Sequence, residues 1–199
     1  ILMTAGGNNP DVLYTVYERF NQADGIFKST NGGQSWNAIP RPLGNSDYTN
    51  GQAWYDLTLD VDPNNSNRVF TGGINHYRTI NGGSNWSQIS DGSTMHVDQH
   101  TVAFNPANSA EMIFANDGGV YYSNNGGSYL TAKNVGYNVT QFYSLSVHPD
   151  PAVDIVIGGT QDNGSHAVTT PQGVGTYFKI SGAYGSFCAV DHQDPDTMY

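Results

Sequence analysis

A short run of histidine and aspartate residues is the first feature of the sequence whose side chains could do chemistry. His96, Asp98 and His100 alternate along the chain, and alternate residues of a β-strand point to the same face. Imidazole and carboxylate groups on one face suit a transition metal. These residues therefore form a candidate site for a structural metal ion, and no other cofactor is expected. The alternative is that they line a polar channel at the start of an inner strand and bond to neighbouring segments.

Two aspartates, Asp117 and Asp162, form a candidate catalytic pair. Each follows a β-rich run and precedes glycine or Asn-Gly. Glycoside hydrolysis uses two carboxyl groups, roughly 5–5.5 Å apart for retention or 6.5–9.5 Å apart for inversion, and neighbouring repeats could bring this pair within the larger range. The alternative is that each carboxylate accepts backbone N–H groups of its own turn. Their shared position in the repeat described below favours that structural role.

Aromatic residues are a third candidate for function, since the chain has 13 Tyr and 3 Trp. Exposed aromatic rings can stack on sugar rings or anchor a protein partner. Trp54, Tyr48 and Tyr55 are the candidate binding residues, because they lie in or next to the long insertion Pro40–Ala53. The alternative for any one of them is packing between sheets.

These residues sit within an internal repeat of forty-odd residues. Three similar segments, Ser29–Trp36, Thr79–Trp86 and Ser123–Leu130, begin 50 and 44 positions apart, and each contains Asn-Gly-Gly. Asn-Gly is the strongest short signal for a β-hairpin. A second marker, a proline after a polar residue, recurs with spacings of 43, 43 and 46, at Pro63, Pro106, Pro149 and Pro195.

Each repeat is predicted to form four β-strands. A polar-Pro turn follows the first strand, and the Asn-Gly-Gly hairpin joins the third strand to the fourth. Four strands in about 40–45 residues are typical of a β-propeller blade. We therefore expect an all-β chain that forms a single partial propeller over residues 1–199, continued by other blades or domains of a longer chain. The expected blades span residues 1–40, 53–90, 98–134, 141–181 and, in part, 186–199.

The eight-residue segments resemble the Asp-box, or BNR repeat, in which Ser or Thr, Asp or Asn, Gly, Ser or Thr, and an aromatic residue recur at set positions. The copy at Ser29 matches every one of these positions, the copy at Thr79 departs at Asn85, and the copy at Ser123 departs at Tyr129 and Leu130. The resemblance implies a structural hairpin in which the Asn oxygen accepts turn N–H groups and the aromatic residue packs on the blade. It assigns this role to Ser29, Asn31, Gly33, Trp36, Thr79, Asn81, Gly83, Trp86, Ser123, Asn125 and Gly127.

A narrower resemblance covers about the last hundred residues. The segments His96–His100, Asn116–Tyr121, Gln141–Tyr143 and Gly158–Gly164 are similar to large secreted bacterial proteins described as sortilin-like or glycosyl-hydrolase-like. The resemblance implies an extracellular or cell-surface location. In xyloglucanase-like relatives, a carboxylate near a segment comparable to that at Asp117 serves in hydrolysis.

Composition narrows the class of partner. The formal net charge is −10 and Lys and Arg together number 7, whereas nucleic-acid binding needs clustered basic residues. No stretch approaches the roughly 20 apolar residues of a membrane-spanning helix, so neither nucleic acid nor membrane insertion is expected. The leading hypothesis is a module that binds a glycan or a protein. A glycoside hydrolase and an architectural repeat array are the alternatives.

Overall fold

The structure, a computed structural model, describes residues 1–44, 46–137, 140–168, 178–182 and 184–199. The chain divides into two compact units, Ile1–Lys133 and Asn134–Tyr199, and each is described by itself. Within the described residues, strands dominate and the single helix, α1 (Ala53–Asp56), is four residues long. No helix among these residues has the length and apolar character needed to cross a membrane.

The first unit contains three antiparallel four-stranded sheets, in each of which consecutive strands are neighbours. Sheet 1 consists of β1 (Leu2–Gly6), β2 (Asn9–Arg19), β3 (Gln22–Ser29) and β4 (Asn37–Ile39). Sheet 2 consists of β5 (Thr58–Asp62), β6 (Asn65–Gly72), β7 (His76–Thr79) and β8 (Ser87–Gln88). Sheet 3 consists of β9 (Gln99–Phe104), β10 (Met112–Asn116), β11 (Gly119–Ser123) and β12 (Thr131–Ala132).

The second unit repeats this order once. Its sheet 4 consists of β13 (Phe142–Val147), β14 (Val156–Thr160), β15 (Ser165–Val168) and β16 (Phe178–Ser181). An isolated β-bridge joins Val190 to Met198 near the C-terminus. Together the four sheets confirm the prediction of an all-β chain built from four-stranded repeats.

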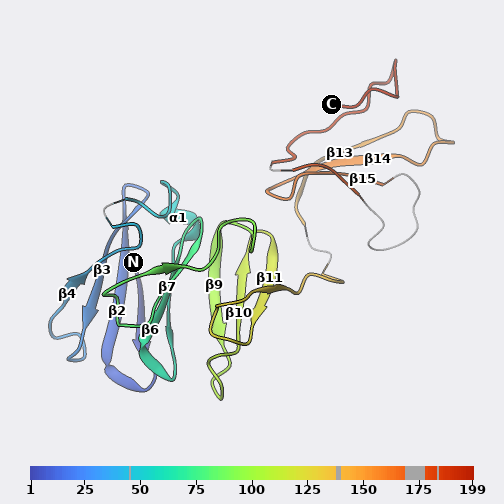
Figure 1. Ribbon diagram of the computed structural model, residues 1–199. Helices are drawn as coiled ribbons and strands as arrows, with labels where there is room; N and C mark the ends of the chain where they lie inside the picture. Colours follow the sequence, from blue (N-terminus) through green and yellow to red (C-terminus); the bar gives the residue numbers. More distant parts are fainter. Residues whose placement is uncertain (45, 138–139, 169–177, 183) are drawn as a thin grey trace. The chain divides into compact units, whose positions relative to one another are not determined.

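The three sheets of the first unit stand side by side, as Figure 1 shows, and the first strand of each is nearest its neighbours: β5 contacts both β1 and β9. Strand β2 shows why they stack, because its alternate residues Val12, Tyr14 and Val16 are buried. They pack against Leu59 and Val69 of sheet 2. This burial of apolar surface between sheets is the main favourable term holding them together.

A second cluster of buried apolar residues joins sheets 2 and 3. Phe70 and Phe114 are fully buried and meet with ring centroids 6.0 Å apart and planes inclined at 67°. Val102, Met112 and Met95 complete the cluster. In the second unit a smaller cluster consists of Ile157, Ala167 and Val190.

The three Asn-Gly-Gly turns of the first unit share one hydrogen-bond pattern. In the second turn the Gly83 N–H donates to Thr79 Oγ1 (3.0 Å), and that hydroxyl donates to Asn81 Oδ1 (2.9 Å). Asn81 Oδ1 also accepts the Asn85 N–H (3.0 Å). The turns at Ser29 and Ser123 repeat these bonds at 2.9 or 3.0 Å. The pattern therefore persists at Ser123 despite the changed residues after its glycines.

Backbone conformation explains why glycine recurs in these turns. Gly82 and Gly83 have φ angles of 68° and 91°, a left-handed region that residues with a Cβ rarely adopt. The indole N–H of Trp86, which follows this turn, donates to the carbonyl of Pro40 (2.7 Å) and so ties the turn to the end of sheet 1.

Replacing Thr79 with valine is expected to lower the free energy of unfolding by about 1–2 kcal/mol, because it leaves the Gly83 N–H without its acceptor. Thr79 is 1% exposed, so water cannot replace the lost bond. Urea unfolding followed by circular dichroism measures the change. Ser84→Ala, in the exposed part of the same turn, is the control and should change stability by less than about 0.5 kcal/mol. Equal effects of the two variants would contradict the structural role of the hydroxyl.

Candidate functional site

Polar and aromatic side chains of the first unit converge where α1 meets the start of β9 and the β10–β11 turn. Helix α1 is held by a hydrogen bond from the Ala53 N–H to the Asn21 carbonyl (2.9 Å). The Asp98 N–H, just before β9, donates to the Ile74 carbonyl (3.1 Å), and the Asp117 N–H donates to the Asp98 carbonyl (3.3 Å). Backbone bonds therefore fix two aspartates next to each other.

Asp117 accepts hydrogen bonds from two side chains. The Tyr55 hydroxyl lies 2.9 Å from both carboxylate oxygens, and His100 Nε2 lies 2.6 Å from Oδ1. The Tyr55 ring meets the His100 ring edge-on with centroids 5.1 Å apart. The neighbouring Gly118 N–H donates to Asn116 Oδ1 (3.0 Å), so Asn116 supports this turn while the Asp117 carboxylate reaches across to α1 and β9.

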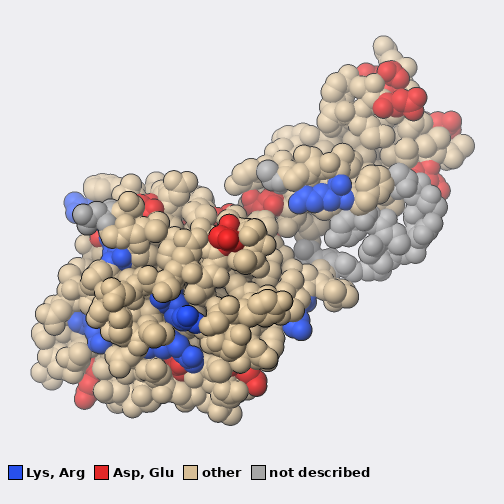
Figure 2. Space-filling model, in the orientation of Figure 1, with Lys and Arg blue, Asp and Glu red and all other residues tan. Residues whose placement is uncertain are grey.

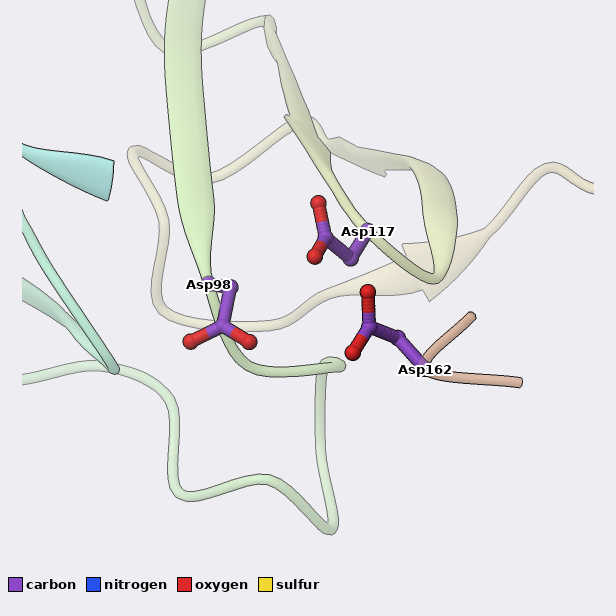
Figure 3. A group of neighbouring side chains, drawn as sticks. All are labelled: Asp98, Asp117 and Asp162. Atoms are coloured by element: carbon purple, nitrogen blue, oxygen red, sulfur yellow. The ribbon is translucent and has the colours of Figure 1, made fainter. Parts of the chain in front are cut away.

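Asp98 and Asp117 lie in the same region, as Figure 3 shows, and one carboxylate oxygen of each lies within 4.8 Å of the other. Asp98 is 7% exposed, and its Oδ1 accepts a hydrogen bond from Gln52 Nε2 (2.6 Å). Burial raises the pKa of the Asp98 carboxyl, and the negative charge of Asp117 raises it further. A proton on Asp98 is therefore easier to keep than on an isolated aspartate.

A third carboxyl, Asp56 at the end of α1, adjoins this pair. It is fully buried, and its Oδ2 accepts a hydrogen bond from Gln52 Nε2 (2.9 Å). Burial raises the pKa of Asp56 to about 7, with a further contribution from the charge of Asp98. We refer to Asp56, Asp98 and Asp117 as the carboxyl cluster.

Two aromatic rings of α1 adjoin the carboxyl cluster. Trp54 is 70% exposed and Tyr55 is 39% exposed, and their ring centroids lie 5.6 Å apart. We refer to this pair as the aromatic platform. It has the exposed apolar ring surface that stacking on a ligand requires.

Tyr48, the other predicted binding residue, lies in the core and not on the surface. It is 2% exposed, packs edge-on against Tyr77 and shares a hydrogen bond with Thr71 Oγ1 (2.8 Å). Burial also raises the pKa of its hydroxyl. Tyr48 is therefore a core residue, and the surface-binding role expected for it does not fit this position.

The expected His96, Asp98, His100 face does not form. The strand begins only at Gln99, and Asp98 has a φ of 61°, so the chain turns between the three residues. The His96 ring packs against Gly118, where a Cβ would collide with it. His100 instead pairs with Asp117, and Asp98 bonds to Gln52, which agrees with the alternative of contacts to neighbouring segments. The prediction that these three residues share one face of a strand was wrong, because Asp98 lies in a turn before the strand begins.

Asp162, the second residue of the predicted catalytic pair, lies in the second unit. It follows β14 and has a φ of 62°. Its pairing with Asp117 stays a prediction.

Comparison with known proteins bears on the fold. No family model matches the sequence, and no curated protein matches it. Among solved structures, the GH74 enzyme of Niastella koreensis aligns over 89% of this chain with a TM-score of 0.52 and 17% identity. The GH74 xyloglucanase of Xanthomonas campestris aligns over 98% of it with a TM-score of 0.51 and 17% identity. Both consist of four-stranded propeller blades.

This chain has a β-propeller fold. It spans 24% of the length of the Niastella enzyme and 34% of the Xanthomonas enzyme. At this identity the likeness extends to the fold alone.

Two residues of the propeller's site, Asp56 and Gln52, were not predicted from the sequence. The only available signal was their place beside Trp54 and Tyr55 at the end of the insertion. Nothing local distinguishes Asp56 from an exposed helix-end aspartate, because its burial depends on the folded surroundings of α1.

Proposed function

We propose that this propeller binds a glycan at the aromatic platform, which the hydrogen bond from Tyr55 to Asp117 ties to the carboxyl cluster. The observation that supports the proposal most is the exposed Trp54 ring directly beside Tyr55, whose hydroxyl bonds to Asp117. A sugar ring has an apolar face that stacks on indole.

The surface composition agrees with an uncharged or weakly charged ligand. On the face drawn in Figure 2, residues other than Lys, Arg, Asp and Glu cover most of the surface, and basic and acidic atoms form small groups among them. An extracellular or cell-surface location is part of this proposal. A protein ligand at the same platform is the alternative occupant, since exposed aromatic residues also anchor protein partners.

Glycoside hydrolysis is the second candidate function. One carboxylate oxygen of Asp98 lies within 4.8 Å of one of Asp117, and glycoside hydrolysis needs two neighbouring carboxyl groups. Burial and the charge of Asp117 raise the pKa of Asp98, which is the direction that a general acid needs. The likeness to a GH74 xyloglucanase makes xyloglucan the first substrate to test. The pair predicted from the sequence, Asp117 with Asp162, is the alternative choice of the two carboxyl groups for the same hydrolysis.

Calorimetric titration with xyloglucan and cello-oligosaccharides tests glycan binding. Trp54→Ala should weaken binding by about tenfold or more, because it removes a stacked ring from the site. Tyr129→Ala is the matched control: this aromatic residue is 69% exposed but lies in the third Asn-Gly-Gly turn, so its loss should leave affinity unchanged. Equal affinity of wild type and Trp54→Ala would contradict the proposed site.

Release of reducing ends from xyloglucan separates binding from hydrolysis. Turnover that disappears in Asp117→Asn would favour the enzyme. Binding without turnover would favour the module. Neither binding nor turnover, in a protein that folds, would favour the architectural array.

A further inference from the structure

The Gln52 side chain joins two carboxyl groups of the cluster. Its amide nitrogen lies 2.9 Å from Asp56 Oδ2 and 2.6 Å from Asp98 Oδ1. A carboxamide has two N–H donors, so each carboxyl takes one. We refer to Gln52, Asp56 and Asp98 as the clamp.

The clamp places two carboxyl groups on either side of one neutral donor, and they repel each other when both are ionised. Asp56 is fully buried, and its Oδ1 has no hydrogen-bond partner among the described residues. The charged or titratable groups that act most on the clamp are Asp117, His96 and His100. A buried carboxylate with an unpaired oxygen is costly, whereas the neutral acid is tolerated far better.

The clamp also bears directly on the aromatic platform. Gln52 immediately precedes α1 and Asp56 is its last residue, so Trp54 and Tyr55 lie between the two ends of the clamp. The helix is only four residues long and has little stability of its own. Its place therefore depends on the clamp, on the backbone bond from Ala53 to Asn21 and on the contacts of Tyr55 with Asp117 and His100.

We propose that Asp56 is a positioning residue: α1 stays in place and the aromatic platform is ordered while this buried carboxyl is neutral, and the platform loosens when Asp56 ionises beside Asp98. The consequence for ligand affinity rests on the proposed glycan site, whereas the order of α1 does not. The raised pKa of Asp56, about 7, places this change near neutral pH.

Trp54 fluorescence without any ligand tests the clamp. The Trp54 signal is the difference between wild type and Trp54→Phe, recorded from about pH 5.5 to about pH 8.5, a window that brackets the ionisation of Asp56. We expect this signal to change with a midpoint near the pKa of Asp56 and to stay flat in Asp56→Asn, which cannot ionise. An unchanged midpoint in Asp56→Asn would overturn the proposal.

Asp60→Asn is the matched control. Asp60 on β5 is another carboxyl whose pKa burial raises, to about 6, but it bonds to the Val102 N–H (3.3 Å) and not to α1. The Trp54 transition should persist in this variant. If it disappears there too, the transition reports general loosening and the clamp is rejected.

A second variant covers the case in which Asp56→Asn fails to fold. Gln52→Leu keeps both carboxyls but removes the donor between them. We expect it to abolish or shift the transition of Trp54, and an identical transition would overturn the proposal.

Unfolding provides a second ligand-free measurement. Asp56 is ionised in the unfolded chain above about pH 4 but stays protonated in the folded protein up to about pH 7, so stability falls as pH rises through this window and levels off above it. Asp56→Asn should lack the share of this decrease in stability that Asp56 causes. If the variant loses as much stability as wild type over the same pH window, Asp56 is not a buried neutral acid.

Ligand titration then separates the clamp from the proposed function. For wild type we expect affinity for a xyloglucan oligosaccharide to fall by about tenfold between about pH 6 and about pH 8.5, and to stay constant in Asp56→Asn. A fluorescence transition without any binding would sustain the clamp and reject the glycan site. Binding that is independent of pH in wild type would sustain the site and reject the clamp.

Discussion

Replacing Phe70 with alanine should lower the free energy of unfolding of the first unit by about 3–5 kcal/mol. Phe70 lies on β6 and is fully buried. Its ring meets Phe104 of β9 at 5.7 Å and Phe114 of β10 at 6.0 Å between centroids. Truncation removes this apolar burial and leaves a cavity between sheets 2 and 3, which only partial relaxation can fill.

Chemical denaturation followed by far-UV circular dichroism measures this loss. Phe20→Ala is the control, because that ring is 82% exposed at a turn of sheet 1 and its removal should cost less than about 0.5 kcal/mol. A loss below about 1 kcal/mol in Phe70→Ala would mean that the contact between sheets 2 and 3 is not the core described here. The variant should also disturb the candidate site, because the same contact positions two strands of that site. Strand β9 carries His100, and Asp117 directly follows β10.

The second large effect is expected from Asp62→Ala, which should lower the free energy of unfolding by about 3 kcal/mol. Asp62 ends β5, is fully buried and forms an ion pair with Arg68 of β6. Arg68 also donates to the carbonyl of Ser109 (2.6 Å) near the start of β10. Removing the carboxylate leaves a guanidinium, whose side chain is only 18% exposed, without its counter-charge.

An exposed ion pair in the same unit supplies the comparison. Arg19 and Asp24 lie 3.8 Å apart with side chains 63% and 39% exposed, and exposed pairs contribute roughly 0–1 kcal/mol. Thermal and urea unfolding of Asp62→Ala and Asp24→Ala should therefore differ clearly. Similar losses in the two variants would show that burial does not strengthen the Asp62–Arg68 pair.

The repeated turns show how much local sequence can predict. Thr79, Asn81 and Gly83 bond to one another within a few residues, so the segment carries nearly all of the information for its own geometry. The same holds for the strand order, because short hairpins leave consecutive strands little choice but to pair with each other. The four-stranded sheets were predictable for this reason.

The site depended on contacts that no short segment contains. Asp98 was predicted to lie in a strand, but it has a left-handed backbone with a φ of 61°, and the strand begins only at Gln99. Tyr48 and Trp54 lie six positions apart in sequence and were predicted to share a role. One is buried in the core and the other is 70% exposed.

The sequence by itself determined the all-β repeat, the three Asn-Gly-Gly turns and the pool of residues able to bind a ligand, because these follow from hydrogen bonds and conformational preferences over a few residues. Only the tertiary structure decided which of them meet. Gln52 reaches Asp98 across 46 positions, and Tyr55 reaches Asp117 across 62. The burial that gives Asp56 its raised pKa likewise arises only in the folded chain, since desolvation is a property of the assembled surroundings.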